Sequence, residues 1–235
     1  MGHLLRRKGI EVQGKVGSSE RFLGVALANV QNPNLVAECH NEYVKAGATV
    51  LTTNSYAAVP KALTLAGSGD WDSIKKVITA SVDIAREAAG RDEKVAVAGA
   101  LPPLGPSYRF DLVGDDDELT AGYNMIVEAV APGSDILLCE TMSCVREAAA
   151  AAKAADKAGL PVWVSYTLNE DGSGRLRSLE TIDAAVDSLS DIKNLAALLI
   201  NCSDHESTCA ALPKLKAKVE ERVANGDSTL RIGAC

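Results

Sequence analysis

The stretch Ala197-Leu198-Leu199-Ile200-Asn201-Cys202 is a short apolar run that ends on an amide and a thiol. Four further apolar runs, at 48–51, 95–98, 136–138 and 162–164, end on polar residues or on glycine, and helix-length, alanine-rich stretches separate them. In parallel α/β proteins, ligands bind at the carboxyl ends of the strands. The pattern therefore predicts a site built from the residues that follow these runs: Thr52, Asn54, Glu140, Ser165 and Cys202.

The runs are apolar throughout rather than alternating, which is typical of strands that are buried on both faces. The strand–helix alternation continues without a linker, so we expect one α/β domain over residues 1–235 with about six parallel strands. A closed (β/α)8 barrel, typically ~250 residues long, would need one strand before Met1 and one after Cys235. An open, doubly wound sheet would need neither, but no strand is followed by its G-x-G-x-x-G fingerprint.

Capping signals set the expected helix starts. Pro33 follows Asn32, Asp70 precedes a helix over 71–89, and Asp117 is expected to cap a helix that reaches about Ala131. Further helices are expected over about 143–158, 179–189 and 206–223.

Composition excludes several classes of protein. A formal charge of −7 disfavours nucleic-acid binding, which needs a basic surface. No apolar run is long enough to span a membrane, and Met1–Gly9 lacks the apolar segment of a secretory signal. The 6 cysteines are therefore expected to be reduced thiols in a cytoplasmic protein.

Two of the candidate site residues, Cys202 and Glu140, have side chains that could react with or bind a substrate. Cys202 at a strand end is either a nucleophile, a metal ligand or a small buried residue, and no C-x-x-C pair supports a local zinc motif. Glu140 ends an apolar strand, where an unpartnered carboxylate is expensive to bury, so it either binds a substrate ammonium or contacts the start of the next helix. Thr52 and Asn54 either line the site or cap a local turn.

Several stretches taken in order resemble the homocysteine S-methyltransferase family. They are Thr52-Thr53-Asn54-Ser55-Tyr56, Val97-Ala98-Gly99, Asp135 to Thr141, Trp163-Val164-Ser165 and Asn201-Cys202. This resemblance covers nearly the whole chain. It implies a (β/α)8 TIM barrel that is incomplete here, with about six of eight strands present and the first and last missing.

The resemblance also implies an activity. The family transfers a methyl group from S-methylmethionine, S-adenosylmethionine or betaine to the thiol of homocysteine, which gives methionine. Zinc is held by three cysteines, of which Cys202 matches one and the other two would lie beyond Cys235. Glu140 matches the carboxylate that binds the substrate amino group, and Thr52 and Asn54 match the strand tip that lines the pocket, where Ser165 is also placed.

The incomplete ligand set leads us to expect a truncated chain with impaired methyl transfer. The alternative is a non-catalytic fragment, or a binder of thiol amino acids that lacks a complete zinc site. A third possibility is an open-sheet α/β protein that uses Cys202 as a nucleophile without a metal.

Overall fold

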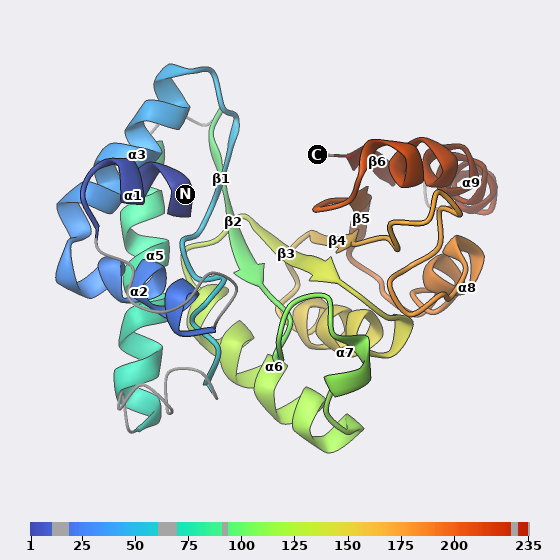
Figure 1. Cartoon of the computed structure of the whole chain (residues 1–235), viewed down its shortest axis with the longest axis horizontal. Coiled ribbons are helices and arrows are strands. Elements are labelled where there is room, and N and C mark those ends of the chain that lie inside the picture. Colours follow the sequence, from blue (N-terminus) through green and yellow to red (C-terminus); the bar gives the residue numbers. More distant parts are fainter. Residues whose placement is uncertain (11–18, 61–69, 91–93, 227–229, 235) are drawn as a thin grey trace. The chain divides into compact units, whose positions relative to one another are not determined.

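The computed structural model describes residues 1–10, 19–60, 70–90, 94–226 and 230–234. The helices are α1 (Gly2–Arg7), α2 (Ser19–Gln31), α3 (Pro33–Lys45), α5 (Trp71–Ala89), α6 (Asp116–Val130), α7 (Val145–Asp156), α8 (Ile182–Asp187) and α9 (His205–Ala224), with a 3-10 turn at Phe110–Leu112. The strands are β1 (Val50–Thr52), β2 (Ala96–Leu101), β3 (Ile136–Met142), β4 (Val162–Tyr166), β5 (Leu195–Ile200) and β6 (Arg231–Ala234). Hydrogen bonding between neighbouring strands follows the chain order from β1 to β6, and Figure 1 labels the elements.

The chain divides into two compact units, and β3 contributes to both. The first unit comprises residues 1–102 and 125–137, and the second comprises 103–124 and 138–235. In the first unit, β1 pairs in parallel with β2, with Thr52 beside Ala98. The start of β3 joins β2 through Asp135, whose backbone N–H donates to the Val97 carbonyl at 2.8 Å.

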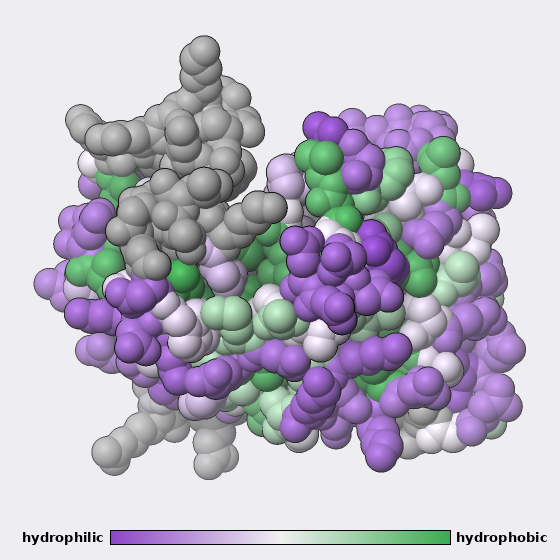
Figure 2. All heavy atoms as spheres, turned by 90° about the horizontal axis from the view of Figure 1, so that it is seen from below, coloured by the Kyte–Doolittle hydropathy of each residue, from purple (hydrophilic) through white to green (hydrophobic). Residues whose placement is uncertain are grey.

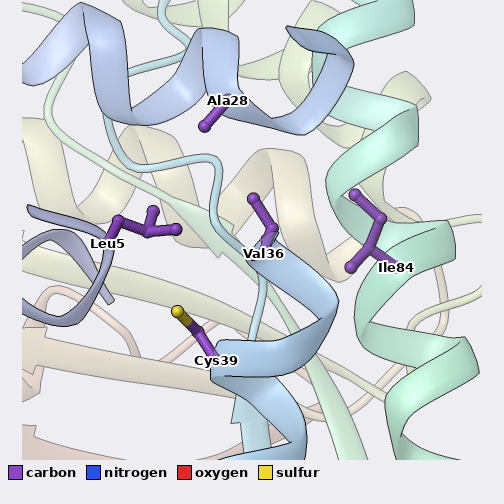
Figure 3. Packing of buried hydrophobic residues seen from close by; sticks show 5 residues of the cluster. All are labelled: Leu5, Ala28, Val36, Cys39 and Ile84. Carbon is purple, nitrogen blue, oxygen red and sulfur yellow. The ribbon is translucent and has the colours of Figure 1, made fainter. Parts of the chain in front are cut away.

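Helices α2, α3 and α5 pack together in the first unit (Figure 1). Their shared interior is apolar, and Figure 3 shows five of its residues: Leu5, Ala28, Val36, Cys39 and Ile84. The side chain of Cys39 points into this interior, and burial raises the pKa of its thiol. Cys39 is therefore a core residue, as its apolar sequence context predicts.

The second unit holds the end of β3, together with β4, β5 and β6. Strands β4 and β5 are parallel, with Tyr166 beside Ile200, and β6 extends the sheet with Ala234 beside Ile200. The end of β3 meets β4, because the Thr167 backbone N–H donates to the Met142 carbonyl at 3.0 Å. Helix α9 packs against β6 and α8 (Figure 1).

The sequence predicts these strands and most of these helices correctly. Asp70 caps α5, its side chain accepting a hydrogen bond from the Ser73 backbone N–H at 2.8 Å. The expected cap at Asp117 is wrong. Asp115 accepts the hydrogen bond from the Glu118 N–H instead, at 2.9 Å, so Asp117 lies inside the first turn of α6. There its negative charge favours the positive end of the helix dipole.

The polar exterior agrees with the acidic composition. Hydrophilic residues cover most of the coloured surface on the face shown in Figure 2. None of the helices in the described part of the chain is long and apolar enough to cross a bilayer.

Candidate functional site

Two of the predicted site residues lie at one end of the sheet in the second unit. Glu140 lies near the end of β3, and Cys202 follows β5 by two positions. The backbone N–H of Thr141 donates to the side-chain oxygen of Asn201 at 3.2 Å, which ties the two strand ends together. The carboxylate and the thiol are therefore at the same, carboxyl-terminal rim, where parallel α/β proteins place their ligands.

No side chain of the described residues forms a hydrogen bond or ion pair with Glu140, although the positive charge of the N-terminal amino group tends to lower its pKa. Its side chain is partly exposed, yet the surrounding protein desolvates it and raises its pKa from 4.5 to about 7. A carboxylate that is desolvated and unpaired is unfavourable when ionised, and a bound cation would remove that penalty. The environment of Glu140 thus suits recognition of an ammonium group.

Cys202 is held in an unusual backbone conformation with its thiol exposed. Its φ is +49°, in the left-handed region that non-glycine residues rarely adopt. The hydroxyl of Thr167 donates to the Cys202 carbonyl at 3.0 Å, which anchors this conformation. Strained backbone at a strand end is characteristic of functional sites.

A tyrosine approaches this thiol from the segment after β2. The Tyr108 hydroxyl is within hydrogen-bonding reach of Cys202, and burial together with this contact raises the pKa of Tyr108. The Arg177 guanidinium lies 4.7 Å from the centre of the Tyr108 ring and forms an ion pair with Glu170 at 2.7 Å. A cation over an aromatic face is attractive, so Arg177 holds the ring in place.

The loop that carries Tyr108 is fixed to α7. The carboxylate of Glu147, which is buried, accepts hydrogen bonds from the Leu104 backbone N–H at 3.1 Å and from the Tyr123 hydroxyl at 3.3 Å. Its neighbour Arg146 donates to the Val113 carbonyl at 3.1 Å. Burial raises the pKa of Glu147, and two consecutive residues of one helix thus anchor both ends of the loop.

The loop after β4, which carries Arg177, is joined in turn to α9. The Ser207 hydroxyl donates to the Asn169 carbonyl at 2.7 Å and accepts from the Gly172 N–H at 3.1 Å. Gly174 has φ +66°, and a Cβ there would lie 2.7 Å from the backbone nitrogen of Ala211. Only glycine fits so close to the helix backbone.

Ser165 is buried, and its hydroxyl donates to the side-chain oxygen of Asn201 at 2.9 Å. In the first unit, Thr52 is partly exposed at the tip of β1, and Asn54 is buried. Both amide hydrogens of Asn54 are used inside that unit, by the Val25 carbonyl at 2.7 Å and by Asn29 at 3.0 Å. The direct contacts of Ser165 and Asn54 are thus with protein, and their proposed place at the site remains a prediction.

The described residues do not form a zinc site around Cys202. They contain no group of three or more His, Cys, Asp or Glu side chains that could hold a metal ion. Cys209 is exposed on α9 and contacts His205 at 3.6 Å. Cys139 and Cys144 are buried, and Cys235 lies outside the described residues. A single thiolate does not fit the four-coordinate ligand set that zinc requires.

A parallel α/β fold with a thiol and a desolvated carboxylate at its strand ends is typical of proteins that bind small molecules there, and comparison with known proteins specifies the class. The homocysteine S-methyltransferase family profile matches residues 1–230, and the chain belongs to this family. The resemblance inferred from the sequence is thereby confirmed.

Relatives in other organisms agree with this assignment. The homocysteine S-methyltransferase of Escherichia coli (strain K12) is 33% identical over an alignment of 205 positions, which covers 79% of this chain and 64% of that protein. The homocysteine S-methyltransferase YbgG of Bacillus subtilis (strain 168) is 26% identical over 93% of this chain and 72% of its own length. The chain therefore spans about two thirds of the length of these relatives.

A solved structure supports the fold. The crystal structure of the homocysteine methyltransferase MmuM from Escherichia coli, in its metallated form, superimposes with a TM-score of 0.81. It is 28% identical, and the match covers 100% of this chain and 89% of that one. The expectation of a partial TIM barrel with parallel strands is confirmed.

Proposed function

We propose that this chain binds homocysteine at the carboxyl ends of its strands and transfers a methyl group to the homocysteine thiol, giving methionine. The donor we propose is S-methylmethionine or S-adenosylmethionine, each of which presents a methyl group on a cationic sulfonium. The observation that carries this proposal is Glu140, a desolvated carboxylate with no hydrogen-bond or ion-pair partner in the described part of the chain.

Glu140 supplies recognition of the amino acid. The positively charged ammonium group of homocysteine would stabilise the negative charge of the Glu140 carboxylate. Binding therefore favours ionised Glu140 and lowers its raised pKa. A charge-assisted hydrogen bond in this partly desolvated environment is stronger than one in water. It also fixes the end of the substrate that does not react, which helps to orient the thiol. Ser165, which belongs to the same unit, is proposed to line the substrate pocket, and Thr52 and Asn54 are proposed as substrate-binding residues on the resemblance to the family alone.

Cys202 is proposed as a zinc ligand. A coordinating thiol is deprotonated, so Cys202 would bind the ion as a thiolate. The remaining zinc ligands are not among the described residues. What the chain itself contributes is an exposed thiol in a fixed backbone conformation at the rim that also carries Glu140.

The second candidate function is binding of a thiol amino acid without turnover. The observation that favours it is that the described residues contain no group of three or more His, Cys, Asp or Glu side chains that could hold a metal ion. Glu140 would serve the same purpose in both cases, so the two functions differ in methyl transfer and not in ligand recognition.

Calorimetry and a methionine assay separate these functions. We expect homocysteine to bind the wild-type chain, and Glu140→Gln to weaken binding by about tenfold or more, since a hydrogen bond to a charged group contributes about 1.5–3 kcal/mol. Methionine formation from homocysteine and S-methylmethionine, with zinc added, is then compared between Cys202→Ser and Cys209→Ser. Cys209 is a second exposed thiol and so a matched control.

Each outcome has a definite meaning. Turnover that is lost in Cys202→Ser and retained in Cys209→Ser supports the methyltransferase with Cys202 at its centre. Binding that depends on Glu140, without turnover in the presence of zinc, supports the binder. Turnover that survives Cys202→Ser refutes the role of Cys202. Homocysteine binding that is unaffected by Glu140→Gln refutes ammonium recognition by Glu140, on which both functions depend.

A further inference from the structure

The side chain of Asn201 connects three strand ends. Its oxygen accepts hydrogen bonds from the Thr141 backbone N–H at 3.2 Å and from the Ser165 hydroxyl at 2.9 Å. Its nitrogen donates to the Thr141 hydroxyl at 2.9 Å and to the Cys202 sulfur at 3.5 Å. One amide thus joins residues at the end of β3, in β4 and after β5.

The orientation of this amide is determined by its partners. A backbone N–H can only donate, so the group that faces the Thr141 N–H must be the amide oxygen. The NH2 group must then face the Thr141 hydroxyl and the Cys202 sulfur. Both lone pairs and both hydrogens are occupied, and Asn201 has no hydrogen-bonding capacity left for a substrate. Its side chain is also buried, with 8% of its surface exposed.

The residues on either side of this amide have strained backbones. Thr141 has φ +61° and Cys202 has φ +49°, and neither is glycine. Such conformations persist where surrounding contacts determine them. Asn201 contacts both residues, and Thr141 directly follows Glu140 in β3. The same amide therefore holds the thiol-bearing residue and the neighbour of the carboxylate.

We infer that Asn201 is a positioning residue that fixes the Cys202 thiol and the Glu140 strand end in one mutual arrangement. It acts through its four hydrogen bonds and does not touch the substrate. The inference rests on the proposed function for the use made of the thiol and the carboxylate. The arrangement itself can be tested without metal or turnover, so failure of one does not imply failure of the other.

The test is alkylation of Cys202 by iodoacetamide at a single pH, with Cys209 as an exposed internal reference and mass spectrometry as the readout. In Asn201→Asp the oxygen that accepts from Thr141 and Ser165 is retained, but the NH2 group is lost. We expect labelling of Cys202 relative to Cys209 to fall about fivefold, the equivalent of one ordinary hydrogen bond. The cause is that the sulfur then faces an acceptor oxygen in place of an N–H donor.

The chain offers a matched control on the same strand. Asn194 precedes β5, whereas Asn201 follows it, and the Asn194 side chain donates to the Asp156 carboxylate at 2.9 Å. Asn194→Asp makes the same chemical change at the opposite end of β5. We expect it to leave the labelling ratio unchanged, even if it lowers the melting temperature as much as Asn201→Asp does.

A second pair of variants covers the case in which Asn201→Asp does not fold. Thr141→Ala removes the hydroxyl that accepts from Asn201 and is expected to alter the labelling ratio, whereas Thr141→Ser keeps the hydroxyl and is expected to restore it. The inference is overturned if folded Asn201→Asp has the wild-type ratio, if Asn194→Asp shifts it equally, or if Thr141→Ala and Thr141→Ser behave alike.

Discussion

Replacement of Glu140 by glutamine is expected to stabilise the protein at pH 8 and not at pH 5. The Glu140 carboxyl has a pKa of about 7 in the folded protein, against 4.5 for an ordinary glutamate, because the protein desolvates it. At about 1.36 kcal/mol per pKa unit, the difference corresponds to at most about 3 kcal/mol. Partial solvent access reduces this penalty, and we expect about 2 kcal/mol.

The direction of this change in stability follows from the proton on Glu140, which the folded state retains to a higher pH than the unfolded chain does. A raised pKa means that the folded protein binds this proton more tightly than the unfolded chain does. Stability from this group is therefore fully present below pH 4.5 and is lost as the pH rises through about 7. Above pH 7 the wild-type chain carries the full penalty. Glutamine, which resembles the protonated carboxyl in shape and does not titrate, carries none.

Urea denaturation at pH 5, 6, 7 and 8 measures this difference. The free energy of unfolding of Glu140→Gln minus that of the wild type is expected to rise across the series and to level off near pH 8. Glu206→Gln, a change at an exposed carboxylate of α9, controls for the general effect of removing a negative charge. A difference that stays constant with pH would refute the desolvation of Glu140, and with it the main support for ammonium binding.

Three further perturbations test other parts of the structure. Gly99→Ala is expected to destabilise the protein by about 2 kcal/mol in urea denaturation, because the new Cβ would lie 2.6 Å from the Ser134 hydroxyl; a loss below about 0.5 kcal/mol would contradict this packing. His40→Leu is expected to flatten the acid side of the stability profile. Burial lowers the pKa of His40 from 6.5 to about 4, so the stability of the wild type falls as the pH drops through that range. An equal fall in the variant would show that His40 does not cause this loss of stability. Arg177→Met is expected to speed backbone hydrogen exchange around Tyr108 by removing the cation over its ring, and unchanged exchange would show that the ring is held by other contacts.

The sequence predicts the strand ends well because their signal is local. An apolar run that ends on polar residues indicates both a buried strand and where that strand ends, and Glu140 and Cys202 lie at one rim of the sheet; their role in binding stays a prediction. Helices α1 and α2 are missed, and for α1 the reason is the opposite one. α1 has only 6 residues, and the stability of such short helices comes from tertiary packing that no local pattern reports.

The environment of the site residues is not encoded locally. Three of the four hydrogen bonds of Asn201 are to partners 60 residues away at Thr141 and 36 residues away at Ser165, so these three have no signature in any window of sequence. Tyr108 follows a proline-rich loop without periodicity, and its approach to Cys202 depends on Arg177 from another loop. For the same reason the exposure of the Cys202 thiol could not be decided from its neighbours in the chain.

The loop after β4 is attached to α9, so we expect the two to move together. The Ser207 hydroxyl forms two hydrogen bonds with the loop after β4, and Gly174 in that loop packs against the backbone of α9. Because Arg177 lies on the same loop, we expect a displacement of Arg177 to displace the beginning of α9 as well. Cys209 lies on α9, in this joined part, and is exposed to solvent. With Cys202 replaced by serine, a fluorescent label on Cys209 would therefore report a displacement of the loop that carries Arg177.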